Sequence, residues 1–579
     1  MTRHDLLLRG GTVVDGTGGP RRVADVAIGD GVIRAIGALD GHGAARVVEA
    51  QGLIVAPGVI DPHTHYDAQV NWDPWATASG WHGMTSAVIG NCGFGYAPVR
   101  PELRVRSMQM MVNTEQIPYA AQAAGLPWTW ETFPQWLDHL RRLPKGVNLA
   151  SFLPVNPLLV HVMGLEAAKS RPATTDERRR LRALLHEAMD AGAAGFAFSY
   201  LGVEGNSHVD FDMTPMPSDL MAPEEAFNLC VVLRERGEGI VQLLSEMPAT
   251  PDPGARRAFV EELARRSGRP VIQNVLVPVR GHPEFHRSGL AWLDACREKG
   301  LEVWMQAFLA RGWTEFHIMD MNAWDAIPVF RAMTAASTVD ARLALACSTA
   351  YRERLRREYR ADAMYQALGP LEAHVLLHAG SDTFRADEGR TLAQIAADRG
   401  AGITDLFLDV LVAGGMQSQF RVDTMIAEEP EWIAELLRHP RILAGSSDGG
   451  AHGKFHCGGQ WSTDVIQYLS RETHTCTLEE LHAALSAKPA RLLGWSDRGT
   501  LAPGQAADVL VYDHAQLGYT FGRYDVLHDL PGGEWRRVAP ARGVRMVIVN
   551  GVPTFEDGTC TGATPGRVLQ APRTAAATA

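Results

Sequence analysis

Two histidines separated by one residue are the first sign of chemistry in this sequence. His63 and His65 lie in the stretch APGVIDPHTHYDAQ, directly after an apolar run. Side chains two residues apart on an extended chain point to the same side. The two imidazoles can therefore converge on one point, and neutral imidazole is a good ligand for zinc and similar ions. A pair of ordinary loop histidines is the alternative, but the Gly/Pro turn after a buried strand favours a metal site.

Cys92 and Asp448 are the next candidates, because each follows an apolar run that is typical of a strand. Cys92 stands among glycines in TSAVIGNCGFG, and a thiolate there would be a strong zinc ligand. Asp448 stands in the Ser/Gly loop of RILAGSSDGG, where a carboxylate could bind the metal and accept a proton from metal-bound water. A buried inert cysteine and a turn-forming aspartate are the alternatives. We predict metal ligation by His63, His65, Cys92 and Asp448, with Asp448 as the catalytic base.

These residues need elements that bring distant strand ends together. Between residues 57 and 497, strand-like apolar runs alternate with amphipathic helical stretches, which predicts an α/β fold with a parallel sheet. Eight such units would close a (β/α)8 TIM-like barrel, whose active site lies at the C-terminal ends of its strands. Residues 1–56 and 498–570 contain short alternating strands and turns, so we expect a small β-sandwich domain built from both chain ends. We also expect a helical insertion at about 311–372 and a loose tail at 571–579.

Composition narrows the class of protein. The chain has 579 residues, and its 46% hydrophobic content is enough for a large core. Its net charge of -11 argues against a nucleic-acid surface. No apolar run approaches the roughly 20 residues of a membrane helix. The seven cysteines form no CxxC pair, so a disulfide framework is not expected. We predict a cytoplasmic enzyme with a small-molecule substrate, and the sequence leaves a homo-oligomeric assembly open.

Together with LLLRGGTVVDGTG, GTLAPGQAADVLVYD and GTCTGATPGRVL, the four candidate positions resemble the amidohydrolase superfamily. More narrowly, they look like the D-aminoacylase (N-acyl-D-amino-acid deacylase) family, over nearly the whole chain. In that family an HxH pair, a cysteine on the second barrel strand and an aspartate on the eighth surround zinc, and they match His63, His65, Cys92 and Asp448. The resemblance implies a zinc-dependent amidohydrolase that cleaves the C–N bond of an amide or a cyclic amide.

The sequence departs from that family at several positions. Gln242 and Asn274 stand where the family carries histidines on its fifth and sixth strands, and Gln306 stands at an aspartate position. Amide oxygens are poorer zinc ligands than imidazole, so we expect one zinc ion per chain rather than two. Leu244 and Leu276 replace basic residues of the same motifs. This change suggests a substrate without a free carboxylate, or one that is bound in another way.

The substrate contacts predicted from the sequence are Gln242, Asn274, His452 and Tyr66. Two alternatives to an amide hydrolase stay open. The first is an enzyme of the same fold that acts on another bond, such as an ester, or that carries out a non-hydrolytic reaction. The second is a catalytically degenerate barrel that only binds a small molecule. The missing histidines favour this last alternative, whereas the retained HxH pair, cysteine and aspartate oppose it.

Overall fold

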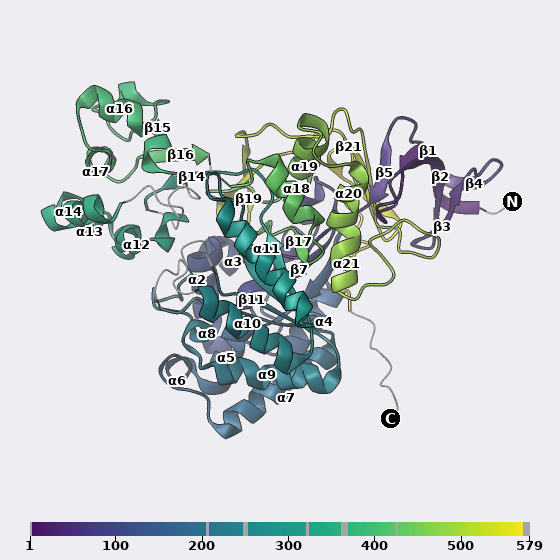
Figure 1. The fold of residues 1–579 in the computed structure, drawn as a ribbon, viewed down its shortest axis with the longest axis horizontal. Coiled ribbons are helices and arrows are strands. Elements are labelled where there is room, and N and C mark those ends of the chain that lie inside the picture. The colour runs from purple at the N-terminus through teal and green to yellow at the C-terminus, as the bar shows by residue number, and fades with distance from the viewer. Residues whose placement is uncertain are drawn as a thin grey trace.

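The computed structural model describes residues 3–203, 208–246, 253–319, 323–359, 369–423 and 426–570 (Figure 1). The expected tail at 571–579 lies outside the described residues, as do parts of the expected insertion at 311–372. Within the described ranges, each helix is either too short or too polar to cross a bilayer.

Parallel strands form the centre of the molecule. One sheet contains β6 (Val59–Asp61), β7 (Met84–Ile89) and β8 (Asn148–Ser151). A second sheet continues with β9 (Leu153–Pro154), β10 (Gly195–Ser199), β11 (Ile240–Leu244), β12 (Val271–Leu276), β13 (Val303–Ala307) and β17 (Ile442–Ala444). Nearly all of their residues are buried, as expected for strands that are covered on both faces. Because the strands are parallel, their carboxyl ends lie at the same edge.

The predicted α/β class is confirmed, but the structure does not show a closed barrel. Phe152 separates β8 from β9, so that the two sheets are distinct. In the described part of the chain, β17 and β6 share no ladder, and a single parallel bridge between Thr64 and Gly449 joins the segments that follow them. Closure into an eight-stranded barrel stays a prediction.

Helices alternate with the strands and have clear sequence signals at their ends. The connecting helices include α4 (Phe133–Arg142), α5 (Val155–Met163), α7 (Thr175–Ala191), α9 (Pro223–Arg236), α10 (Pro253–Ser267), α11 (Pro283–Glu298) and α18 (Pro430–Arg438). Thr174 and Glu177 form a reciprocal capping box at the start of α7, and Gly192 ends that helix with a φ of 107°. These signals fix where each helix stops and the next strand begins.

The two chain ends meet in one sheet of nine strands (Figure 1). The N-terminal strands are β1 (Arg3–Val13), β2 (Arg22–Gly29), β3 (Val32–Gly37), β4 (Gly43–Glu49) and β5 (Ile54–Pro57). The C-terminal strands are β18 (Val509–Tyr512), β21 (Val544–Val549), β22 (Val552–Glu556) and β23 (Thr559–Cys560). β18 pairs antiparallel with β5 and so joins the two groups. The sandwich architecture and the predicted domain boundaries stay predictions.

A separate unit stands at the other end of the molecule from β1 to β4 (Figure 1). It contains an antiparallel sheet in the order β14 (Trp313–His317), β16 (Gln419–Asp423), β15 (Val375–His378). Its helices include α12 (Pro328–Ala335), α13 (Val339–Cys347), α14 (Thr349–Glu358), α16 (Leu392–Arg399) and α17 (Ile403–Ala413). Phe316, Phe330, Phe407 and Phe420 belong to a hydrophobic cluster of its own. The inserted unit is thus a small core that packs independently of the central sheets.

Candidate metal centre

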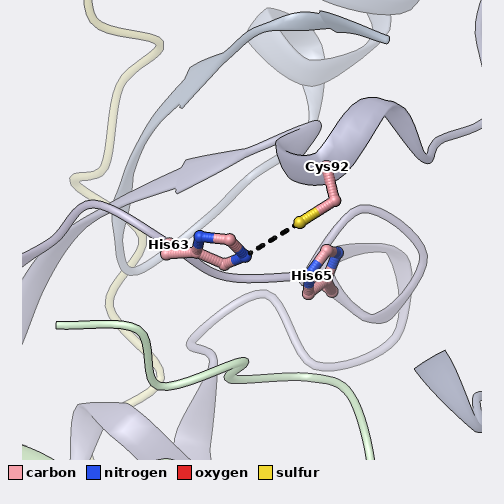
Figure 2. A group of neighbouring side chains, drawn as sticks. All are labelled: His63, His65 and Cys92. Atoms are coloured by element: carbon pink, nitrogen blue, oxygen red, sulfur yellow. Dashed lines mark hydrogen bonds between the residues drawn. The ribbon is translucent and has the colours of Figure 1, made fainter. Parts of the chain in front are cut away.

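His63 and His65 lie directly after β6, at the carboxyl edge of the parallel strands. Each is only 1% exposed. The backbone N–H of Thr64 donates to the carbonyl of Val88 at 3.1 Å, and the N–H of His65 donates to the carbonyl of Gly449 at 2.8 Å. These bonds tie the histidine segment to the neighbouring segments on both sides, so that both rings are held in the interior (Figure 2).

Cys92 lies in the turn that follows β7 and faces the two histidines (Figure 2). Its Sγ is 3.5 Å from Nε2 of His63. His63, His65 and Cys92 each offer one ligand atom, and these atoms all lie within 4.8 Å of one another. The backbone of Cys92 has a φ of 54°, a left-handed conformation that is uncommon outside glycine. Strained residues of this kind collect at functional sites, where the surrounding structure holds them in place.

Asp448 reaches the same point from the loop after β17. Its Oδ1 lies 3.3 Å from Nε2 of His63 and 3.7 Å from Nε2 of His65. Ligands bound tetrahedrally to zinc at about 2.0–2.3 Å stand about 3.3–3.6 Å from one another, whereas a direct N–H···O bond is about 2.9 Å long. The observed separations match the spacing of ligands better than that of hydrogen bonds. The two imidazoles and the thiol can therefore share a zinc-sized cation, and the Asp448 carboxylate lies beside both imidazoles.

A buried amide fixes the orientation of His63. Gln306 donates through Nε2 to the carbonyl of Pro62 at 3.1 Å, so its Oε1 faces Nδ1 of His63 at 2.8 Å. This contact favours the tautomer in which Nδ1 carries the proton and donates to Gln306. The unprotonated Nε2 is left facing Cys92 and Asp448. A hydrogen bond that fixes the tautomer of a ligating histidine is a general feature of metal sites.

Gln242 and Asn274 form a second set of amides behind Cys92. The backbone N–H of Cys92 donates to Oε1 of Gln242 at 2.7 Å, and Nε2 of Gln242 donates to Oδ1 of Asn274 at 3.0 Å. Nδ2 of Asn274 is 2.6 Å from Nδ1 of His63 and 3.7 Å from Sγ of Cys92. With Nδ1 protonated, the acceptors within reach of Nδ2 of Asn274 are Nε2 of His63, at 3.4 Å, and Sγ of Cys92. These amides thus support the thiolate form of Cys92.

Burial favours the neutral forms of the clustered side chains when no cation is bound. Burial lowers the pKa of His63, and it lowers that of His65 well below the ordinary value. Burial raises the pKa of Cys92 well above its ordinary value. The Asp448 carboxyl keeps 31% of its side-chain surface exposed, yet desolvation still raises its pKa to about 7. A bound cation favours the deprotonated thiol and carboxyl.

Two further residues at the site were missed by the sequence analysis. Glu115, the last residue of α2 (Arg104–Glu115), places Oε2 3.5 Å from Nε2 of His65. His208 stacks on Phe94 with ring centroids 5.6 Å apart, and its charge would oppose protonation of His65. Neither residue belongs to a recognisable motif. Their positions depend on how α2 and a loop return to the strand ends.

The other predicted contacts have different surroundings. Nε2 of His452 lies 3.4 Å from Oε2 of Glu115, which places this histidine at the edge of the cluster. The hydroxyl of Tyr66 forms a 2.6 Å hydrogen bond with Oγ of Ser79, and its ring lines a narrow cavity with Gly449. The polar atoms of Gln242 are used by Cys92 and Asn274. Substrate contact by all four predicted residues stays a prediction.

The candidate site lies at the carboxyl ends of parallel strands and combines buried histidines with a thiol and a carboxylate. This arrangement is typical of α/β enzymes that carry their active site at that edge. The profile of the amidohydrolase family matches residues 46–208 and 407–555, more than half of the sequence, and the chain belongs to this family. The unmatched stretch between these two segments, 209–406, holds β11 to β13 and most of the inserted unit.

Individual relatives agree with the family and confirm the predicted resemblance. The chain is 27% identical to a D-aminoacylase of Alcaligenes xylosoxydans xylosoxydans, over 99% of this chain and 98% of the relative. It is 29% identical to an uncharacterised protein of Mycobacterium tuberculosis, over 90% and 86% of the two chains. A crystal structure of D-aminoacylase superposes with a TM-score of 0.64 and 24% identity, covering 98% of this chain and all of the other. An N-acyl-D-glutamate deacylase of Bordetella bronchiseptica, solved with zinc and a phosphonate inhibitor, gives a TM-score of 0.63 over the same share of each chain at 24% identity.

Proposed function

We propose that this protein is a zinc-dependent hydrolase of a C–N bond in a small amide or cyclic amide, similar to the N-acyl-D-amino-acid deacylases. The observation that carries the proposal is the convergence of His63, His65 and Cys92 at ligand spacing, with the Asp448 carboxylate beside both imidazoles. The names of the relatives support the choice of an amide bond. They include a D-aminoacylase, an N-acyl-D-aspartate deacylase and an N-acyl-D-glutamate deacylase.

In this proposal, His63, His65, Cys92 and Asp448 hold the zinc ion. A bound zinc ion acidifies water and polarises an amide carbonyl. Asp448 is the only one of the four with a substantially exposed side chain, at 31%, and it can therefore meet a water molecule from the solvent side. Its carboxylate accepts the proton of the attacking water and then gives a proton to the leaving nitrogen. The buried histidines keep that carboxylate in place.

A cavity of about 330 Å³ beside α2 has room for a small substrate. Gln116, which follows Glu115, lines it, and so do Val209, Arg331 and Lys454. Arg331 comes from α12 of the inserted unit, so this unit contributes a cationic group near the predicted site. Leu244 and Leu276 stand where the family carries basic residues. The Arg331 guanidinium can take over the binding of a substrate carboxylate. We propose this cavity as the substrate pocket.

The test is an activity screen on metal-reconstituted protein. The panel holds N-acetyl-D-amino acids, their L enantiomers, cyclic amides and simple esters. Hydrolysis of an amide that is lost with a chelator and restored by zinc supports the proposal. Cleavage of esters alone would replace the amide by another bond. Protein that takes up no zinc and turns over nothing, even after zinc-supplemented expression, would instead be the degenerate binding barrel.

A further inference from the structure

A narrow cavity of about 50 Å³ lies beside the loop that carries Asp448, and the proposed reaction does not use it. The backbone of Gly449 and Gly450, directly after Asp448, lines one side, and β20 (Glu534–Val538) contributes to the other. A single water takes about 10–15 Å³ on this scale, so the cavity has room for about three or four non-hydrogen atoms. It shares Lys454 with the proposed substrate pocket, but it is too small for a whole substrate.

Several polar atoms at this cavity are buried without a partner. Gln460 is 1% exposed, and among the described residues neither its Nε2 nor its Oε1 has a hydrogen-bond partner. The same holds for Nε and Nη1 of Arg537 and for the indole N–H of Trp72. All three side chains line the cavity. Buried polar atoms are costly when they stay unpaired, and most of these atoms are donors, so the cavity calls for a ligand with hydrogen-bond acceptors.

The lining of the cavity is also cationic. The lining residues all lie within the described ranges, and they include Lys454, Arg536 and Arg537 but no aspartate or glutamate. Lys454 pairs with Glu534 at 2.8 Å and Arg537 pairs with Glu315 at 3.2 Å, and neither carboxylate is part of the lining. Lys454 and Arg537 keep further N–H groups for a second acceptor. Water satisfies hydrogen bonds only, whereas an anion also gains from the positive charge.

Aromatic rings and the backbone hold these cationic groups in place. The guanidinium of Arg537 lies 4.9 Å from the ring centroid of Tyr524 and 5.0 Å from that of Trp535. Nζ of Lys454 lies 5.2 Å from the same Trp535 centroid. The backbone N–H of Arg537 donates to the carbonyl of Gly453 at 2.7 Å, which ties β20 to the opposite wall. The donors are therefore ordered before a ligand binds, which lowers the cost of binding.

We propose that this cavity binds a small carboxylate anion of the size of formate or acetate. The carboxylate accepts hydrogen bonds from the unpartnered N–H groups of Arg537, Trp72 and Gln460. The bound anion also contacts the backbone directly after Asp448 and so holds the loop that carries the proposed base. Hydrolysis of an N-acetyl amide by water gives an amine and acetate, so the ligand is the acyl product. This last link rests on the proposed function, whereas the anion binding does not.

The test is saturation-transfer NMR with acetate as the probe. It is run on zinc-loaded protein and on protein stripped of metal and dialysed free of chelator, because the stripped form excludes acetate bound to zinc. We expect the acetate methyl signal to show transfer in both forms. Butyrate is too long for the cavity and acetamide is neutral, so neither should show transfer from the stripped protein. Absence of transfer to acetate in the stripped protein, or equal transfer to acetamide, would overturn the proposal.

Variants of Gln460 locate the binding. Gln460→Leu removes the unpartnered amide, and Gln460→Glu places a negative charge in the cavity, so each should weaken acetate binding at least about tenfold. Gln516→Leu is the matched control, because Gln516 is exposed and lies outside the lining, and it should bind acetate like the wild type. A thermal melt without acetate shows which variants are folded.

Undiminished acetate binding in either folded Gln460 variant would place the anion elsewhere and contradict the site. Neither readout needs turnover. Failure of the amide-hydrolysis screen would therefore overturn the proposed reaction and leave the anion site standing, whereas a lack of acetate binding would overturn the anion site alone.

Discussion

At the scale of single residues, the side chains of the proposed zinc site differ in their access to water. His63 and His65 are enclosed, whereas the Asp448 carboxylate is partly exposed. Desolvation raises the pKa of this carboxyl to about 7 when no cation is bound, and a bound cation favours the deprotonated form that a general base needs. This carboxylate is therefore the side chain whose loss should affect turnover most.

We expect Asp448→Asn to reduce turnover by about 10²–10⁴-fold, because the amide cannot take a proton from water. The fold and the zinc bound through His63, His65 and Cys92 should remain nearly intact. Steady-state kinetics, a thermal melt and metal analysis of the same preparation check this. Unchanged turnover in the variant would remove Asp448 as the base.

Gln306 offers a test of the histidine orientation. In Gln306→Leu the Nδ1 proton of His63 loses its acceptor, and we expect zinc affinity to fall about 10–100-fold. Gln306→Glu keeps an acceptor oxygen and should retain most of that affinity. Competition with a chromophoric chelator measures both. Equal zinc affinity in Gln306→Leu and the wild type would show that the tautomer is set in another way.

Strand-end histidines, a cysteine and an aspartate could be selected from the sequence because each follows an apolar run, and the structure brings all four together. Glu115 could not be selected in this way. It ends an ordinary helix whose register depends on contacts such as the 2.6 Å ion pair between Arg106 and Asp210. Tertiary packing alone brings Glu115 to the site, so no local sequence pattern marks this residue.

At the scale of elements, the turn after β7 determines where the thiol stands. Gly93 in this turn has a φ of 77°, and a Cβ there would lie 2.5 Å from the backbone Cα of Phe198 in β10. The backbone of β10 cannot move aside without disturbing the parallel sheet. The position of the turn is thus coupled to the strand beside it.

We expect Gly93→Ala to weaken zinc binding and to lower the free energy of unfolding by more than the roughly 1 kcal/mol of a left-handed alanine alone. Gly18→Ala is the matched control, since Gly18 has a φ of 84° with open space around it. Chelator competition and denaturant titration compare the two variants. If Gly93→Ala binds zinc like the control, the turn does not position Cys92.

The alternation of strands and helices can be predicted from the sequence, because capping residues such as Thr174 mark helix starts. The strand pairing of the sheet in the inserted unit cannot be predicted in this way. β14 and β16 pair through Phe316 and Phe420, although about 100 residues separate them. Short strands that pair over such a distance carry too little local periodicity to reveal their partners.

At the scale of the whole molecule, His82 joins the central part of the chain to its C-terminal segment. Its Nε2 donates to the carbonyl of Ala539 at 2.7 Å, and its Nδ1 is 2.8 Å from the hydroxyl of Thr463 in α19 (Trp461–Ile466). Burial lowers the pKa of His82 from 6.5 to about 4. The folded protein therefore holds this ring neutral at mildly acidic pH.

This shift predicts a loss of stability in acid. Between pH 6.5 and 4 the unfolded chain binds a proton at His82 and the folded chain does not, so stability falls as the pH falls. From pH 7 to pH 5 the contribution of His82 is about 2 kcal/mol. His82→Gln should lack this part of the pH dependence, whereas exposed His528→Gln should keep it. Denaturant unfolding at the two pH values measures the difference, and parallel pH dependence in wild type and His82→Gln would exclude the assignment.

The shared sheet of the two chain ends has a consequence for biosynthesis. β5 ends at Pro57 and its partner β18 begins at Val509, so about 450 residues must leave the ribosome before the edge of β5 can be covered. At about 5–20 residues per second this takes roughly 20–90 seconds. During that time the nascent N-terminal strands present an open edge to other chains. Chaperone occupancy of the emerging polypeptide should therefore begin with these first strands and end when the last strands are released.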